Sequence, residues 1–159
     1  MEVHDEIHDI SAAIDDISLA IASEVNIVIS GGDAAARTAL AWLIHQSQDS
    51  AGSFIVLSAP AERDPAGAQA MIRGSNGGTL FIEELADLDI DTLHELLRVV
   101  DARGPDANVA APRRVIAAMG DDLQDRIASD PILGNLFYRL NSIHLVVQPL
   151  VLPAKTWLM

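Results

Sequence analysis

Hydrophobic positions along the chain follow two alternating spacings. In residues 4–23, isoleucines recur every three or four positions, a spacing that predicts an amphipathic helix. Short β-branched apolar runs, typical of strands buried on both faces, occur at 25–30, 53–58, 78–83, 113–119 and 142–147. Helical patterns separate these runs at 34–47, 66–73, 89–103, 121–128 and 131–139. In the helix at 34–47, Leu40, Leu43 and Ile44 are expected to form the buried side.

Strands that alternate with helices imply a parallel sheet covered on both faces. The sequence therefore predicts an α/β fold, a three-layer αβα sandwich around a five-stranded parallel sheet, with residues 1–159 as a single domain. In such sheets ligands bind beyond the carboxyl ends of the strands. That edge is expected to hold residues 31–38, the pair Glu83 and Glu84, and the pair Met119 and Gly120.

Composition narrows the classes of function. The 159 residues include no cysteine, which excludes disulfides, thiolate metal sites and cysteine nucleophiles. The formal net charge of −13 opposes contact with phosphate backbones, so direct nucleic-acid binding is not expected. No uncharged apolar run approaches the ~18 residues that a membrane span needs, and the first residues are acidic, unlike a secretory signal. We therefore expect no membrane association and a cytoplasmic location.

The segment GGDAAART, residues 31–38, has the outline of a phosphate-binding loop, G-x-x-x-x-G-K followed by Ser or Thr. It keeps the first glycine and the hydroxyl of Thr38, but Ala36 replaces the second glycine and Arg37 the lysine. Ala36 adds a Cβ where backbone must approach phosphate, and the planar fork of arginine is not interchangeable with an ammonium. Asp33 can cap the following helix and would repel phosphate. Two interpretations stay open: a plain capped helix, or a weak nucleotide site formed by Gly31, Gly32, Ala36, Arg37 and Thr38.

Two glutamates end the apolar run TLFIEE. Glu83, together with Thr38, is a candidate ligand for magnesium, and Glu84 is a candidate base for activating water. Adjacent strand residues point to opposite faces, so both can serve one site only if the strand end bends. The alternative is two acids on a sheet rim. His4 and His8 lie one helical turn apart, but without a third ligand a solvated face is expected.

Four further segments carry a family resemblance: GGTLFIEELADL (77–88), LHELLRVVD (93–101), RRVIAAMGDDL (113–123) and LFYRLNSIHLVVQPL (136–150). With the loop, their order and spacing resemble the AAA+ ATPase domain of bacterial sigma-54-dependent transcription activators. The resemblance implies a P-loop NTPase core with strand order 5-1-4-3-2, ATP with magnesium as cofactors, and ring assembly. It also implies that Glu84 matches the catalytic acid and that Arg139 matches one of two arginine fingers, the other position being Leu133.

The chain also departs from the family pattern. Arg37 replaces the family's lysine, Glu83 its aspartate, and Met119 and Gly120 its sensor Thr-Asn pair. The GAFTGA peptide that engages sigma-54 is absent, and the sequence stops near the point where the helical lid and the DNA-binding domain would begin. We therefore expect a degenerate, non-catalytic regulatory or protein-interaction module without a lid, a pseudo-ATPase.

Two predictions concern ligands and partners. The cofactor is expected to be none, or weakly bound ATP or ADP with magnesium. The partner is expected to be a protein, either a homologous AAA+ activator or a second copy. The alternative function is a slow ATPase using Arg37, Thr38, Glu83 and Glu84. A phosphoacceptor receiver domain also fits the size and sheet type, but Gly31 and Gly32 stand where its acidic pair should be.

Overall fold

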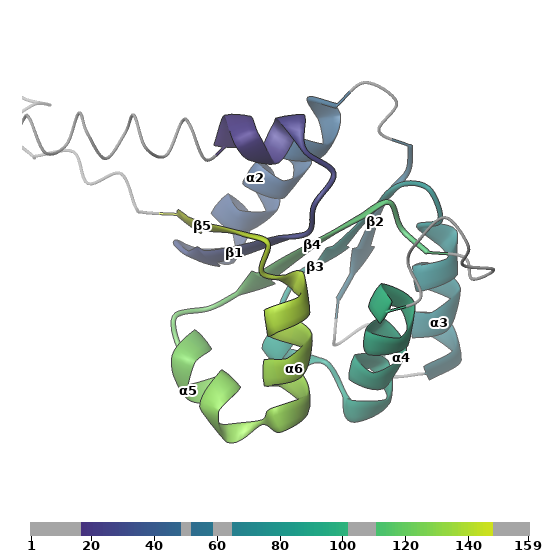
Figure 1. The fold of residues 1–159 in the computed structure, drawn as a ribbon, viewed down its shortest axis with the longest axis vertical. Helices are drawn as coiled ribbons and strands as arrows, with labels where there is room; N and C mark the ends of the chain where they lie inside the picture. The colour runs from purple at the N-terminus through teal and green to yellow at the C-terminus, as the bar shows by residue number, and fades with distance from the viewer. Residues whose placement is uncertain (1–16, 49–51, 59–64, 102–110, 148–159) are drawn as a thin grey trace, which may run out of the picture.

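The computed structural model describes residues 17–48, 52–58, 65–101 and 111–147. Its centre is a five-stranded parallel sheet in the order β2-β3-β4-β1-β5 (Figure 1). This order is the predicted 5-1-4-3-2 read from the other edge. It differs from the 2-1-3-4-5 order of receiver-type sheets, so the receiver alternative is wrong. The strands are β1 (Ile27–Gly31), β2 (Phe54–Leu57), β3 (Thr79–Ile82), β4 (Arg114–Met119) and β5 (Ile143–Val147).

Helices cover both faces of this sheet, as a three-layer sandwich requires (Figure 1). One face carries α2 and a helical segment at 17–22, the described part of the predicted helix 4–23. The other face carries α3, α4, α5 and α6. His4 and His8 lie outside the described residues. The helices are α2 (Ala34–Gln46), α3 (Pro65–Gly74), α4 (Ile90–Asp101), α5 (Leu123–Ser129) and α6 (Pro131–Leu140), with a 3-10 turn η1 at Leu85–Asp87.

The central strands are almost continuously apolar because helices cover both faces of the sheet. Val28 of β1 packs in the core beneath α3 to α6, whereas Ile27 and Ile29 pack beneath α2, and none of the three is exposed to solvent. Every residue of β4 is buried. Full burial of each such aliphatic side chain stabilises the fold by about 1.5–3 kcal/mol. Within the described ranges, each helix is too short or too polar to cross a lipid bilayer.

Two details of the predicted core are wrong. The run at 53–58 was expected to be a fully buried strand, but β2 lies at the sheet edge, pairs only with β3, and buries only Leu57 completely. In α2, Leu43 is 46% exposed, because it lies about 100° around the helix from Ile44. The buried side of α2 is instead formed by Arg37, Ala41, Ile44 and His45. An arginine and a histidine therefore lie on the buried side of α2, for which the hydrophobic pattern predicted only aliphatic residues.

Candidate functional site

The loop between β1 and α2 is shaped by two consecutive glycines. Gly31 and Gly32 have φ values of +78° and +60°, a left-handed conformation that side chains disfavour. A Cβ on Gly31 would overlap the carbonyl oxygen of Val147, and one on Gly32 would lie 2.8 Å from Cγ1 of the same residue. The neighbouring strand β5 therefore presses on the loop, and both positions require glycine.

Asp33 caps the helix that follows this loop. Its backbone is extended, and its Oδ1 accepts a hydrogen bond of 2.7 Å from the amide of Ala36. The predicted cap is confirmed. The free amides of a helix's first turn are the groups that bind phosphate at helix N-termini. In this structure the amide of Ala36 already has a carboxylate partner.

Arg37 lies inside the loop, not out in solvent. Only 7% of the residue is exposed, and its Nη1 donates hydrogen bonds to the carbonyl oxygens of Gly31 at 2.9 Å and Gly32 at 2.8 Å. Its Nη2 lies 3.9 Å from Oε2 of Glu84, an ion pair between α2 and the end of β3. Its Nε is buried and has no hydrogen-bond partner among the described residues. The guanidinium therefore folds back over its own loop and reaches across the sheet edge.

Glu84 lies where the ends of three elements meet. It follows β3 with extended backbone, and its Oε2 is close enough to Gly120, after β4, that a Cβ there would lie 3.7 Å away. Burial raises the pKa of Glu84, while the backbone amides of Gly120 and Ala86 and the charge of Arg37 act in the opposite direction. The carboxylate is thus half-enclosed by backbone groups and one cation.

The two side chains predicted to hold magnesium face separate partners. Oε2 of Glu83 accepts a hydrogen bond from the hydroxyl of Ser58, which follows β2. Thr38 donates its hydroxyl to the carbonyl oxygen of Ala34, at 2.9 Å, one turn back along α2. In the part of the chain that the structure describes, no three His, Cys, Asp or Glu side chains are grouped to hold a metal ion. A shared magnesium site at these residues stays a prediction.

Sequence reasoning did not identify Ser58 as part of this edge. Its only signal was its place as the last residue of the strand predicted at 53–58. The contact with Glu83 also shows how the two glutamates diverge. Glu83 turns toward β2, and Glu84 turns toward α2 and β4, as their adjacent positions implied.

These residues, arranged in this way, do not fit the phosphates of a nucleotide. A phosphate cradle needs backbone N–H groups that face the ligand. In this loop the carbonyl oxygens of Gly31 and Gly32 face the guanidinium of Arg37, the carboxylate of Glu84 lies 3.9 Å from it, and the carboxylate of Asp33 accepts from the amide of Ala36. An anion entering the loop would meet oxygen atoms where it needs donors.

Arg139 lies at the opposite end of the strands, where the parallel strands begin. It stands one residue before the end of α6, which leads into the start of β5, and its side chain is 42% exposed. It forms an ion pair with Asp101, the last residue of α4, and its Nε donates to Oδ1 of Asn135 at 3.0 Å. The six residues of β4 separate the two ends of the strands by about 20 Å. Arg139 therefore cannot reach the loop of its own chain, and neither Asp101 nor Asn135 was predicted to be its partner.

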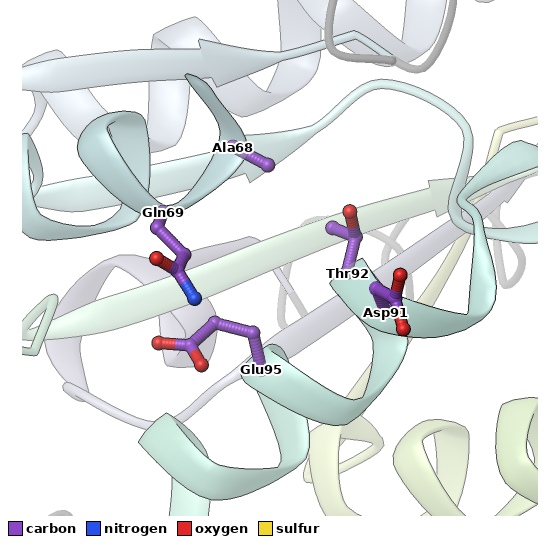
Figure 2. A pocket seen from close by; sticks show the side chains of 5 residues that line it. All are labelled: Ala68, Gln69, Asp91, Thr92 and Glu95. Carbon is purple, nitrogen blue, oxygen red and sulfur yellow. The ribbon is translucent and has the colours of Figure 1, made fainter. Parts of the chain in front are cut away.

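A small pocket lies between α3 and α4, away from the loop (Figure 2). Gln69 and Glu95 extend toward each other across it, and Thr92 lies at one side (Figure 2). Glu95 also pairs with Arg98, and this hydrogen bond lowers the pKa of the glutamate. None of the lining residues was a predicted site residue; they are Ala68, Gln69, Asp91, Thr92 and Glu95.

Comparison with known proteins decides the family. The family model described as the sigma-54 interaction domain matches residues 61–146, more than half of the chain. The chain belongs to the sigma-54 interaction domain family. The matched segment includes Glu83, Glu84 and Arg139, whereas the loop with Arg37 precedes it.

Relatives of this sigma-54 interaction domain are transcription regulators. Regulatory protein AtoC of Escherichia coli is 29% identical over 152 residues, which cover 80% of this chain and 33% of AtoC. The C4-dicarboxylate transport transcriptional regulatory protein DctD of Rhizobium meliloti is 28% identical over 152 residues, with the same 80% and 33% coverage. The chain thus spans about a third of the length of these relatives. Family and relatives together support a regulatory role.

Solved structures of similar proteins share the fold. NtrX from Brucella abortus in complex with ATP superposes with a TM-score of 0.71 at 23% identity, covering 89% of this chain and 37% of NtrX. The P-loop NTPase domain of an Escherichia coli sigma-54 activator superposes with a TM-score of 0.64 at 19% identity, covering 91% and 97%. The predicted P-loop NTPase fold is confirmed.

Proposed function

We propose that this sigma-54 interaction domain is a non-catalytic regulatory module that acts by binding a homologous sigma-54-dependent activator. The observation that carries the proposal is an asymmetry between two arginines. Arg37, where a catalytic loop has its lysine, is buried against its own loop and Glu84. Arg139, where the strands begin, is exposed, and its partners among the described residues, Asp101 and Asn135, lie on the surface.

The loop residues support the absence of turnover. Phosphoryl transfer depends on positioned donors and on a residue that orients the attacking water. Arg37 is engaged by carbonyl oxygens, and Met119 and Gly120 carry no amide side chain to orient water. The loss of one positioned donor commonly lowers rates by about 10²–10³. Several losses in one site leave little hydrolysis.

The exposed end of α6 supports action on a partner. An arginine supplied in trans stabilises charge on a neighbour's transferring phosphate, and Arg139 has the exposure that such a role requires. The net charge of −13 opposes the approach of a second copy of this chain. A homologous activator with a complete nucleotide site is therefore the better partner.

Binding to the host's own sigma-54-dependent activators, purified one at a time and loaded with ATP, tests this proposal. The Arg139→Met variant should bind at least about tenfold more weakly than the wild type, the scale of one lost charge-assisted contact. Arg98→Met is the matched control, because Arg98 is also an exposed helical arginine paired with a carboxylate. Equal affinities of wild type and Arg139→Met would reject the role of Arg139.

A slow ATPase is the second candidate, since Thr38 and Glu84 keep catalytic residue types and the relative NtrX was solved with ATP. Multiple-turnover hydrolysis by the chain alone distinguishes the two. We expect no turnover above background. Turnover that disappears in Glu84→Gln would establish an enzyme and reject the non-catalytic proposal.

A further inference from the structure

We propose that the loop after β1 is a receptor for a guanidinium cation, and that Arg37 is its permanent internal ligand. The chain's own side chain would then join the elements that a bound nucleotide joins in a working ATPase. This inference deepens the non-catalytic proposal, on which it rests, and concerns the loop only.

The loop provides acceptors where a phosphate site provides donors. The left-handed glycines turn the carbonyl oxygens of Gly31 and Gly32 toward α2, and both accept from the same nitrogen of Arg37, at 2.9 and 2.8 Å. Two convergent carbonyl oxygens create a negative potential in the loop. A planar cation with several fixed donors matches such a site, and an anion does not.

Charge balance also favours a cation in this place. A buried arginine needs a counter-charge and hydrogen-bond partners, because desolvating an unpaired charge is costly. Glu84 supplies the counter-charge at 3.9 Å from Nη2, while the carbonyls take Nη1. The two ends of the fork serve different elements at once. A single lysine ammonium lacks this fork, so lysine would not reproduce the joint.

The consequence is a joint that does not depend on nucleotide. Arg37 on α2 links the end of β1 to Glu84 after β3, and Glu84 lies against Gly120 after β4. These are the strand ends at which ligands bind in open α/β sheets. With the link made inside the chain, the sheet edge keeps one conformation whether nucleotide is present or not.

Chemical rescue tests the receptor directly. The Arg37→Ala variant removes the guanidinium but keeps both carbonyls and Glu84, and its Tm should fall by roughly 5–10 °C. Millimolar methylguanidinium chloride should restore part of this loss, whereas tetramethylammonium chloride at equal ionic strength should not. Arg98→Ala, which removes an exposed paired arginine, should neither melt early nor respond to methylguanidinium.

A second set of melts uses anions. Wild type should show no Tm shift with millimolar ATP or ADP plus magnesium, or with pyrophosphate, although a ligand at ~100 times its Kd would shift it by several degrees. A wild-type shift that disappears in Arg37→Ala would overturn the proposal, because the loop would then be a phosphate site. An Arg37→Ala protein that melts like wild type, or ignores methylguanidinium, would also overturn it.

If Arg37→Ala does not fold, Arg37→Lys provides a second test of the receptor. It retains the positive charge but not the fork, so its Tm should still lie below that of the wild type. A Tm equal to that of the wild type would show that charge alone suffices and would reject the guanidinium receptor. None of these melts involves Arg139, so failure here is distinguishable from failure of partner binding.

Discussion

Two arginines pair with carboxylates at opposite ends of the parallel strands, Arg37 where the strands end and Arg139 where they begin. The two ion pairs differ in burial. The side chains of Arg37 and Glu84 are 8% and 26% exposed, whereas those of Arg139 and Asp101 are 42% and 51% exposed. Charges shielded from water interact strongly, while exposed pairs are weakened by solvent and salt. The same chemical pair can therefore hold the fold together at one end of the strands and stay available to a partner at the other.

A positive charge at a family position can serve the fold of its own chain or remain available for binding. From the sequence alone, a weak nucleotide site that includes Arg37 was one of two open interpretations of the loop. The contacts of Arg37 are with carbonyl oxygens and a carboxylate of its own chain. Among the described residues, the partners of Arg139 are Asp101 and Asn135, which lie on the exposed surfaces of helices. A binding role is therefore better supported at α6 than at the loop.

The largest expected effect is on the buried pair. Arg37→Met leaves the carboxylate of Glu84 and two carbonyls without their cation, so the free energy of unfolding should fall by about 3 kcal/mol. Arg139→Met should lower it by less than about 1 kcal/mol, because its pair is exposed. Urea unfolding of both variants measures the difference. Equal losses would show that burial does not distinguish the two arginines.

The glycine that shapes the loop should show the next largest effect. Gly31→Ala should destabilise the fold by about 2–4 kcal/mol, from the left-handed backbone together with overlap of Val147. Gly77→Ala is a matched control: its φ is +74°, but a Cβ there would have open space. We expect it to cost about 1 kcal/mol, the backbone strain alone. If the two variants unfold at the same urea concentration, β5 does not constrain the loop.

Acid should destabilise the protein through two histidines. Burial lowers the pKa of His45, and nearby Arg113 and Arg114 lower it further, against a hydrogen bond with the backbone of Gly52. Burial also lowers the pKa of His144. As the pH falls, these histidines therefore take up protons in the unfolded chain before they do so in the folded protein. Their contribution to the free energy of unfolding should be intact above about pH 6.5 and be lost as the pH falls through their lowered pKa values in the folded protein.

Unfolding free energies measured across this range in His45→Gln test the assignment. The variant should lose part of the pH dependence, because glutamine does not titrate. His144→Gln should lose a further part of the slope, because burial lowers the pKa of His144 as well. A His45→Gln slope identical to that of the wild type would assign the acid sensitivity elsewhere.

The smallest effect on stability is expected at Asp101. Asp101→Asn removes the charge that pairs with Arg139, so the free energy of unfolding should change by less than about 0.5 kcal/mol. The freed arginine should bind the partner activator more tightly than in the wild type. Weaker binding would mean that Asp101 orients Arg139 for the partner and does not compete with it.

The sequence predicted the elements of this fold because local spacing encodes them. The five strands and the helices between them lie within a few residues of the predicted bounds, and Asp33 caps α2 as expected. The parallel sheet follows from the alternation of these elements, and the strand order from the family resemblance. Together they bring Gly31, Glu84 and Gly120 to one edge, where the sequence expected a site.

Only the tertiary structure decided what the side chains do there. The charged partners of Arg37 and Arg139, and the hydroxyl partner of Glu83, come from elements distant in the sequence, so no local pattern reveals them. Burial likewise depends on how an element packs in the fold, which is why β2, at the sheet edge, is only partly buried and α2 buries Arg37 but not Leu43. Periodicity specifies local backbone conformation, whereas long-range register and packing determine which charges meet and how far water separates them.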